Sequence, residues 1–455
     1  MLHPPLSRGV VWALGGVAAC FFLVLLFLDL RRGHPNTFSV FYYAAKALVA
    51  GGDIYKSRPP GSDRAEYVYP PLFALLVVPL AHFKVATATR IWTVVDALLT
   101  LLALAMGARE TTRRFQLPRS QAVLWVIAAG GLLLGMGEFK TELGTSQTDT
   151  LVLASFVLAL STLDRQPVLC GMAVGFSANI KYQTLIVLPY LLLTRRWRAA
   201  FSTAVSSAGF ALLPGLLIGF ARNAQFLHEA LGGLGGFASI HSKGAASTVP
   251  LTWIRSISLT SAMARVLDRC MINPNRAFLL APLVACGFLA LAWLLYRRNR
   301  LSMAPLASAV VRSGSRLESL VAVEWAGLMV AWLVFGPEVS RRHMYVLLLM
   351  HMLAVGMLFK VRGRQRMLLI AGMLIGQAGL RMPAGSGDIG TFFNWVGGAS
   401  WTLLIYYAAL LSACCSWVGS RRGRELRPAL QTRVGKDAMA GVLDHSAPLD
   451  LSAGA

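Results

Sequence analysis

The sequence predicts an all-α membrane protein whose chain crosses the bilayer many times. Of its 455 residues, 56% are hydrophobic and only 14% are charged, with a mean hydropathy of +0.60, whereas soluble proteins carry about a quarter charged residues. Apolar runs of about 20 residues, the length that spans a bilayer, recur along the chain. The basic residues behind the net charge of +23 lie in short stretches between these runs, which is the positive-inside pattern rather than a nucleic-acid surface.

The basic stretches set the expected topology. We expect five of them on the cytoplasmic side: Arg109 to Arg119, Arg195 to Arg198, Arg297 to Arg316, Lys360 to Arg366, and the tail from Arg421. The apolar stretch from Val10 to Leu30 is longer than the apolar core of a signal peptide and lacks a cleavage pattern, so we expect an uncleaved first span. It reaches the outer side near Arg31.

The stretch from Tyr69 to Ala81 is expected not to span. It has about a dozen residues, which is too short for a span, and a crossing here followed by a return at Ile91–Gly107 would place the Arg109 stretch outside. Pro70 and Pro71 remove backbone donors, and such a backbone must be shielded by protein or line a cavity when it lies in lipid. The Tyr-Pro-Pro turn therefore predicts part of a functional site.

The remaining spans follow from the same rule. They are Pro118–Gly137, Asp149–Leu163, two short helices within Val168–Leu193, Ala199–Phe220, Arg276–Tyr296, Leu317–Phe335, Met344–Phe359, Met367–Leu380 and Gly398–Val418. About twelve crossings result, with the N-terminus and the tail inside.

This topology divides the chain into one membrane domain and a tail. Residues 1–420 are expected to form a single transmembrane domain, with 31–85 as its first outer loop and 221–275 as a long outer loop. Apolar periodicity predicts interfacial helices around Phe38–Leu48 and Leu251–Ile257. Residues 421–455 are polar and rich in small residues, which predicts a disordered cytoplasmic tail.

Lys181 lies at the expected tip of the short helix pair, after Asn179 and Ile180. A lysine in an apolar segment is costly unless it faces a cavity or a partner. It would serve as a point charge for a phosphate; the alternative is a lysine that extends to the membrane surface.

Glu338, Arg341, Arg342 and His343 form a polar cluster between two spans, on the expected outer side. Basic residues there run against the positive-inside rule, which favours a functional role. The arginines would clamp a phosphate, and His343 would bind it or shuttle a proton. The alternative is a solvated turn with internal ion pairs.

Gln147 and Asp149 begin a span after Gly144-Thr145-Ser146. Helix capping explains part of this pattern, and a polar contact with substrate explains it equally well. The six cysteines are scattered without the spacing of a metal or disulfide site, so no metal or cofactor is expected.

Several short motifs resemble glycosyltransferase family 87, the former domain of unknown function 2029. The first outer loop carries Phe38-Ser39-Val40-Phe41-Tyr42-Tyr43-Ala44-Ala45, then Gly52-Asp53-Ile54-Tyr55, then Tyr69-Pro70-Pro71-Leu72-Phe73. Further matches are Gln147, Ile180-Lys181, Leu188-Pro189-Tyr190, Arg195-Arg196-Trp197-Arg198, Gly336-Pro337 and His343. The resemblance covers roughly Val10 to Lys360, and its specificity comes from the order and spacing of the motifs.

The resemblance implies a GT-C-like fold in the cell (inner) membrane with an extracytoplasmic active site. It implies transfer of a hexose, above all mannose, from a polyprenyl-phosphate-linked donor to a hydroxyl of a glycolipid or glycan acceptor, with inversion and without a cofactor or metal. Lys181, Arg341 and Arg342 would bind the donor phosphate. The substrate cleft would include Thr37, Tyr42, Tyr69 and Gln147.

One departure from the family concerns the catalytic base. The family places an aspartate just before the aromatic helix of the first loop, where this chain has Thr37. We therefore expect Glu66 or Glu338 to replace it, with His343 also catalytic. The alternatives are a catalytically inactive homologue, or a transporter or flippase of a lipid-linked or anionic substrate. A transporter would be expected to repeat the short helix pair in its second half.

Overall fold

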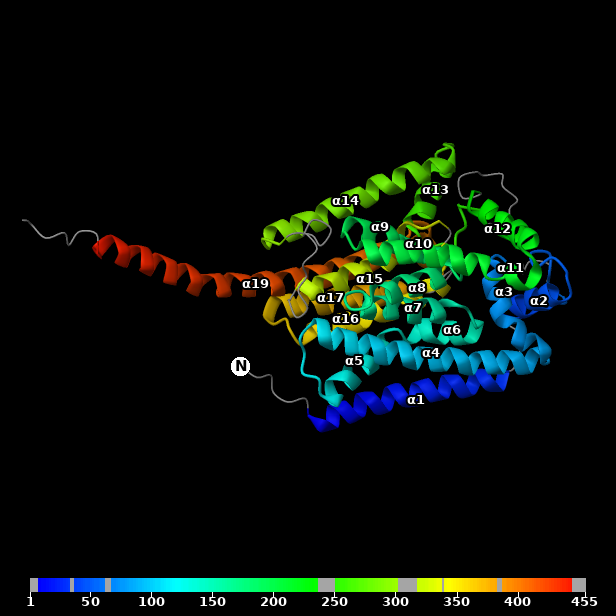
Figure 1. Cartoon of the computed structure of the whole chain (residues 1–455), viewed down its shortest axis with the longest axis horizontal. Coiled ribbons are helices and arrows are strands. Elements are labelled where there is room, and N and C mark those ends of the chain that lie inside the picture. The colour runs from blue at the N-terminus through cyan, green and yellow to red at the C-terminus, as the bar shows by residue number, and fades with distance from the viewer. Residues whose placement is uncertain are drawn as a thin grey trace, which may run out of the picture.

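The computed structural model describes residues 7–32, 37–61, 67–235, 250–301, 317–337, 339–382 and 387–443. Within these ranges every regular element is an α-helix or a 3₁₀-helix, which confirms the predicted all-α class. The helices run roughly along one direction and form an elongated bundle (Figure 1).

Six of the described helices are long and apolar enough to cross a membrane. They are α1 (Arg8–Arg32), α4 (Val85–Arg114), α10 (Trp197–Leu212) continued by α11 (Gly215–Ile218), α14 (Ala277–Arg298) with the preceding turn, α15 (Leu317–Phe335) and the first half of α19 (Gly398–Leu443). A seventh span results if α5 (Gln121–Leu134) and α6 (Met136–Thr145), which meet at 68°, count as one broken span. The chain is therefore a multi-pass membrane protein.

Shorter helices fill the spaces between the long ones (Figure 1). They are α7 (Asp149–Thr162), α8 (Pro167–Ala178), η2 (Tyr182–Ile186), α9 (Val187–Leu193) and α16 (Leu348–Leu358); α17 (Gly363–Arg381) is as long as α15 and packs on α19. The close packing of α8 on α10 depends on Gly171 and Gly175, because a Cβ at either position would collide with Ser202 or Ser206. Small residues at such contacts are the usual means of helix association in lipid.

A network of ion pairs joins four segments at one end of the bundle. Arg114 Nε donates to Glu110 Oε1 at 2.5 Å, and Arg114 Nη2 donates to Asp164 Oδ2 at 3.0 Å. Asp164 Oδ1 also accepts from Arg196 Nη1 at 2.7 Å, and Arg113 Nη1 donates to Glu318 Oε2 at 3.1 Å. Two of the basic stretches predicted to be cytoplasmic, 109–119 and 195–198, therefore meet at the same end.

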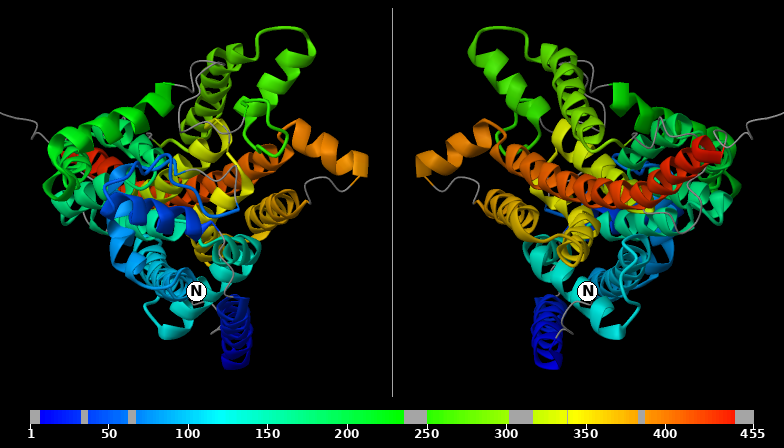
Figure 2. Two further views of the ribbon diagram at one scale, coloured as in Figure 1. Left: turned by 90° about the vertical axis from the view of Figure 1, so that its right-hand side faces the viewer. Right: turned by 90° about the vertical axis from the view of Figure 1, so that its left-hand side faces the viewer.

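The opposite end carries the shorter surface elements, namely α2 (Phe38–Val49), α3 (Pro71–Val77), η1 (Val78–His82) and α12 (Phe220–Gly235) (Figures 1 and 2). Together α3 and η1 extend about 20 Å, at about 1.5 Å per residue for the α-helix and about 2.0 Å for the 3₁₀-helix, well short of the about 30 Å of the hydrocarbon core. This agrees with the expected non-spanning Tyr-Pro-Pro segment.

The two predicted interfacial helices differ in outcome. Phe38, Phe41 and Leu48 lie on α2 as predicted, although they are buried rather than spread on a surface. The prediction for Leu251–Ile257 is wrong: this stretch is a run of turns, and the nearest helix, α13, covers Leu259–Arg269. A distant segment holds the backbone there, because Ile257 N donates to Val339 O at 2.8 Å and not to a carbonyl one turn earlier.

The chain end also differs from the expectation of a disordered tail after residue 420. The backbone of α19 continues as a helix to Leu443 and projects from the bundle (Figure 1), and residues 444–455 lie outside the described part of the chain. The stretch from Arg421 to Leu443 is rich in Arg, Leu and Ala, which are strong helix formers.

Candidate active site

Two basic side chains from distant parts of the sequence, Lys181 and His343, both contact one carboxylate oxygen of Asp149. Lys181 Nζ donates to Asp149 Oδ2 at 2.7 Å, and His343 Nδ1 lies 3.2 Å from the same oxygen. Lys181 Nζ and His343 Nδ1 are themselves 3.2 Å apart. We refer to these residues as the Lys181–Asp149–His343 cluster.

Local structure explains the position of each member. Asp149 is the first residue of α7, where free backbone N–H groups and the helix dipole favour a negative charge. Lys181 follows the end of α8 in an extended conformation, and Asn179 fixes that end by donating to Gly175 O and Ser207 O, each at 2.9 Å. His343 belongs to the 3₁₀-helix η5 (Arg341–Leu347), which precedes α16.

Burial and charge define the state of the cluster. The side chain of Asp149 is fully buried, that of Lys181 is 7% exposed, and that of His343 is 26% exposed. Burial acts to lower the pKa of Lys181, but Asp149 and other acidic neighbours outweigh it, so the pKa is raised and the amine stays charged. Burial lowers the pKa of His343, and the Lys181 ammonium adds to this effect while Asp149 opposes it. The imidazole is therefore neutral at neutral pH.

Further carboxylate oxygens near the cluster lack hydrogen-bond partners among the described residues. They are Asp149 Oδ1, Glu142 Oε2 and both oxygens of Asp96. The other oxygen of Glu142 accepts from the N–H and the hydroxyl of Thr150, each at 3.2 Å, and so caps α7. Buried polar atoms are almost always paired, so these oxygens are suited to accept hydrogen bonds from a polar ligand or from water.

The Tyr-Pro-Pro segment borders the cluster. Tyr67 is buried, and its hydroxyl donates to Pro70 O at 2.7 Å and accepts from Ala74 N at 2.9 Å, which caps the start of α3. Tyr55 donates from its hydroxyl to Tyr69 O at 3.0 Å. Burial raises the pKa of the Tyr69 phenol, and the charge of Lys181 opposes this. Tyr69 therefore lies close enough to Lys181 for the ammonium to act on its phenol.

The predicted phosphate-binding arginines have different surroundings. Arg341 donates from Nη1 to Met382 O and from Nη2 to Asn394 Oδ1 at 3.0 Å, so its guanidinium ties η5 to the ends of α17 and α18 (Gly387–Trp395). Arg342 is exposed, beside His343. The two predicted bases, Glu66 and Glu338, lie outside the described residues.

The four residues predicted to line the substrate cleft lie on different elements of the structure. Tyr42 donates its hydroxyl to Phe83 O at 2.7 Å, which fastens α2 to the end of η1. Thr37 begins α2 without a side-chain cap. Gln147 is buried in the turn between α6 and α7, two residues before Asp149. Of these residues, Tyr69 and Gln147 have the closest links to the cluster.

Two acidic residues at this site, Asp96 and Glu142, were not singled out by sequence reasoning. Asp96 stands alone inside the apolar helix α4, and an ionisable residue in a span is itself a signal of function. Sequence reasoning did not select Glu142, because the charged residues Glu138, Lys140 and Glu142 make this segment look like a polar loop rather than a helix. Within the described ranges, no three His, Cys, Asp or Glu residues are arranged to hold a metal ion.

The fold and the cluster together define a multi-pass membrane protein with a buried, charged centre near one end of its bundle. Residues 67–319 match glycosyltransferase family 87, and this match covers more than half of the 455-residue chain. The chain belongs to this family and is thus a membrane glycosyltransferase, as the sequence motifs predicted.

A curated relative and two solved structures are also similar to this chain. The relative is the polyprenol-phosphate-mannose-dependent alpha-(1-2)-phosphatidylinositol mannoside mannosyltransferase of Mycobacterium tuberculosis, 24% identical over 363 residues that cover 77% of this chain and 76% of that protein. The structures are ArnT from Cupriavidus metallidurans, bound to undecaprenyl phosphate and in the apo state. They are 16% and 15% identical to this chain, cover 91% of it and 77% of their own chains, and each has a TM-score of 0.41.

Proposed function

We propose that the protein transfers a hexose from a polyprenyl-phosphate donor to a hydroxyl of a glycolipid or glycan acceptor, and that mannose is the favoured hexose. The observation that carries the proposal is the meeting of Lys181, Asp149 and His343 at one carboxylate oxygen, with distances of 2.7 and 3.2 Å. Family membership and the donor named for the mycobacterial relative support the choice of donor. The reaction takes place at the extracytoplasmic face, because the cluster lies away from the arginine-rich turns.

The leaving group determines what the site must supply. The bond between the anomeric carbon and the phosphate oxygen breaks while the acceptor oxygen bonds to the opposite face of that carbon, which inverts its configuration. The departing phosphate gains negative charge, so fixed cations close to it stabilise the transition state. Lys181 is held charged by Asp149 and has further N–H donors, and the exposed Arg342 adds a second cation at the rim.

His343 is the base that the geometry favours. When Nδ1 carries the proton, it donates to Asp149 Oδ2 and leaves the lone pair of Nε2 for the acceptor hydroxyl. Nε2 then takes the hydroxyl proton, and Asp149 stabilises the imidazolium that forms. This arrangement supplies a base although Thr37 occupies the family's aspartate position. Glu66 and Glu338 are the competing candidates for the same role.

The unpartnered carboxylate oxygens suit the sugar. A hexose presents several hydroxyl donors, and Asp96, Glu142 and Asp149 offer acceptors without partners among the described residues. A site built to accept such hydrogen bonds rejects ligands that lack them, because its own buried groups would stay unpaired. These three carboxylates are therefore proposed to hold the sugar ring.

Transfer by the purified protein tests this proposal. The protein is reconstituted in liposomes of total lipid from its source organism with radiolabelled polyprenyl-phosphate-mannose, polyprenyl-phosphate-glucose or a nucleotide-activated mannose. We expect label to move from a polyprenyl-phosphate donor to a new product with equimolar release of polyprenyl phosphate. Lys181→Ala is expected to reduce the rate by roughly 10²-fold or more, whereas Arg198→Ala at the other end keeps the wild-type rate.

Two results would contradict the proposal. One is the absence of transfer from every polyprenyl-phosphate hexose. The other is movement of the intact donor across the bilayer without release of polyprenyl phosphate, which is the behaviour of a flippase. A full rate in Lys181→Ala would remove the proposed donor site while leaving the reaction itself in place.

A native cysteine reports the side of the membrane. Cys270 is exposed after α13, whereas the other exposed cysteines, Cys20 and Cys286, lie within α1 and α14. A membrane-impermeant maleimide added to intact cells should label Cys270. It should fail to label a cysteine placed at Arg364, in the first turn of α17. Labelling of the Arg364→Cys site alone would put the proposed active site in the cytoplasm.

A further inference from the structure

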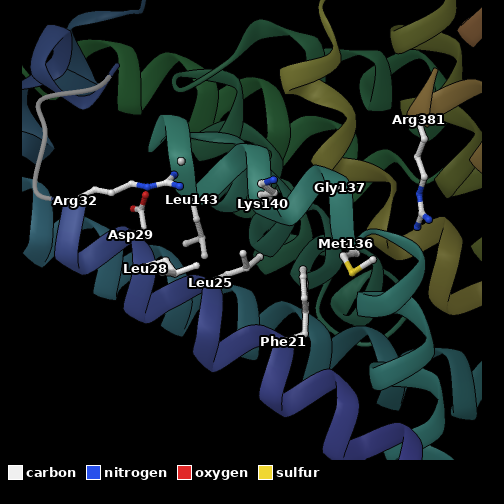
Figure 3. Close-up of a pocket in the computed structure, with 11 residues that line it drawn as sticks. Phe21, Leu25, Leu28, Asp29, Arg32, Met136, Gly137, Lys140, Leu143 and Arg381 are labelled. Atoms are coloured by element: carbon white, nitrogen blue, oxygen red, sulfur yellow. The ribbon is translucent and has the colours of Figure 1, made fainter. Parts of the chain in front are cut away.

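The bend between α5 and α6 opens a groove on the outside of the bundle. Because these helices meet at 68°, α6 leaves the direction of α1 and a cavity of about 460 Å³ lies between them (Figure 3). The lining residues come mainly from α1 and α6: Phe21, Leu25, Leu28, Asp29, Arg32, Met136, Gly137, Lys140, Leu143, Gly144 and Arg381.

The floor of the groove is apolar and continuous. Phe21, Leu25 and Leu28 follow one another at helical spacing on the same face of α1, and Figure 3 shows their side chains in a row along that helix. On α6, a Cβ added at Gly137 or Gly144 would have no other atom within 4 Å. These glycines keep the facing surface of α6 bare, so the space accommodates an apolar chain.

The rim of the groove is cationic. Arg32, Lys140 and Arg381 line it with a single carboxylate, Asp29, and the hydroxyl of Thr93 donates to that carboxylate at 3.3 Å. Lys140 is exposed, and no hydrogen bond or ion pair joins it to another described residue. Its charge is therefore available to an anionic ligand.

The groove has the orientation of a membrane lipid. Arg32 ends α1, and Phe21 lies eleven residues earlier, about 16 Å deeper at 1.5 Å per residue. The outward side of α1 at this level, with Leu23, Val24 and Phe27, is exposed and apolar, as expected for a surface in contact with lipid. Arg32 thus lies at headgroup level and the apolar floor extends into the hydrocarbon.

We propose that this groove binds one anionic glycerophospholipid, with its phosphate between Arg32 and Lys140 and an acyl chain along Phe21, Leu25 and Leu28. Helix α6 separates the groove from the Lys181–Asp149–His343 cluster. Phe139 of α6 stacks on Phe22 of α1 at 5.0 Å between ring centroids, and its ring lies 6.4 Å from that of Tyr345 in η5. A phosphate in the groove is therefore on the far side of α6 from the reacting phosphate, which distinguishes this lipid from the sugar donor.

The bound lipid would position α6 for catalysis. Lys140 faces the groove, whereas Glu142, two residues later, caps α7 beside Asp149 through Thr150. A lipid that fixes α6 against α1 thereby also fixes the capping carboxylate. The proposal itself concerns binding and does not depend on which sugar is transferred.

Native mass spectrometry of the full-length protein in detergent tests the proposal, with phosphatidylglycerol, phosphatidylcholine of the same acyl chains and undecaprenyl phosphate as probes. We expect phosphatidylglycerol to be retained preferentially. Lys140→Ala should weaken its binding about tenfold, as expected for the loss of one charge-assisted contact, and should weaken phosphatidylcholine binding less, because the choline cation of that lipid already neutralises its phosphate. Gly144→Leu should fill the groove and remove both lipids, whereas Gly287→Leu, at an equally open position on α14, should leave both unchanged.

Three results would overturn the proposal. They are equal binding of phosphatidylglycerol by wild type and Lys140→Ala, equal effects of Gly144→Leu and Gly287→Leu, and displacement of phosphatidylglycerol by undecaprenyl phosphate at equal concentration. The last result would assign the groove to the donor. Each variant is first checked for a wild-type unfolding temperature, and Gly137→Leu replaces Gly144→Leu if the latter does not fold.

Discussion

Lys181 and His343 are 162 residues apart in the sequence, yet Lys181 Nζ lies 3.2 Å from His343 Nδ1. A protonated imidazole at this distance from an ammonium would be repelled, so the contact fits a neutral histidine. Asp149 is what allows the two to meet, since both nitrogens face its Oδ2. Asp149 keeps Lys181 charged, whereas burial and the Lys181 ammonium keep His343 neutral.

The buried ion pair should make Lys181 important for stability as well as for activity. Lys181→Ala leaves the fully buried Asp149 carboxylate without its cation, which we expect to destabilise the protein by about 3–5 kcal/mol. The double variant Lys181→Ala/Asp149→Asn removes the charge too and should be more stable than Lys181→Ala alone. Denaturant unfolding in detergent measures both, and equal stability of these two variants would contradict a buried charged pair.

The pH dependence of transfer should report His343. Because burial holds its pKa below the ordinary 6.5, Nε2 is free at neutral pH and is blocked only when the pH falls through the lowered value. The rate should therefore be level near pH 7 and decrease on the acid side, with a midpoint below 6.5. The residual rate of His343→Gln should lack this acid limb, and persistence of the limb in that variant would assign it to another group.

The side chain of Arg341 should contribute to the stability of the protein, whereas that of Arg342 should not. Arg341→Ala removes the bonds to Met382 O and Asn394, so Arg341→Ala and Asn394→Ala should be non-additive, with a coupling of about 0.5–3 kcal/mol in unfolding free energy. The exposed Arg342 serves as the matched control, and Arg342→Ala should change stability by no more than about 0.5 kcal/mol. Strict additivity of the first pair would show that the two side chains do not interact in the protein.

Tyr67 should stabilise the Tyr-Pro-Pro segment through its hydroxyl. Tyr67→Phe leaves the buried N–H of Ala74 without a partner, at an expected cost of about 1–3 kcal/mol. Tyr182 provides the control, because its buried hydroxyl has no partner among the described residues. Tyr182→Phe should thus be neutral or stabilising in the same thermal unfolding assay, and a smaller loss in Tyr67→Phe than in Tyr182→Phe would refute this role.

The sequence predicted the helical membrane class, the family and two members of the central cluster. Lys181 and His343 stood out because a charged residue in an apolar segment or against the positive-inside rule is costly unless it is used. Asp149 was noted only as a helix cap or a contact with substrate, and its pairing with Lys181 and His343 was not predicted, because the three residues are far apart in the sequence. The same limit applies to Arg341, whose partners Met382 and Asn394 lie 41 and 53 residues away in the sequence, and no local pattern encodes such contacts.

The most direct test of the account is a single-turnover measurement of sugar transfer from polyprenyl-phosphate-mannose by wild type and His343→Ala. Loss of a general base predicts a rate decrease of about 10²–10⁴-fold, while the affinity for the donor and the unfolding temperature stay close to those of wild type. An unchanged transfer rate in His343→Ala would contradict the central claim that this histidine, oriented by Asp149 beside Lys181, takes the proton from the acceptor.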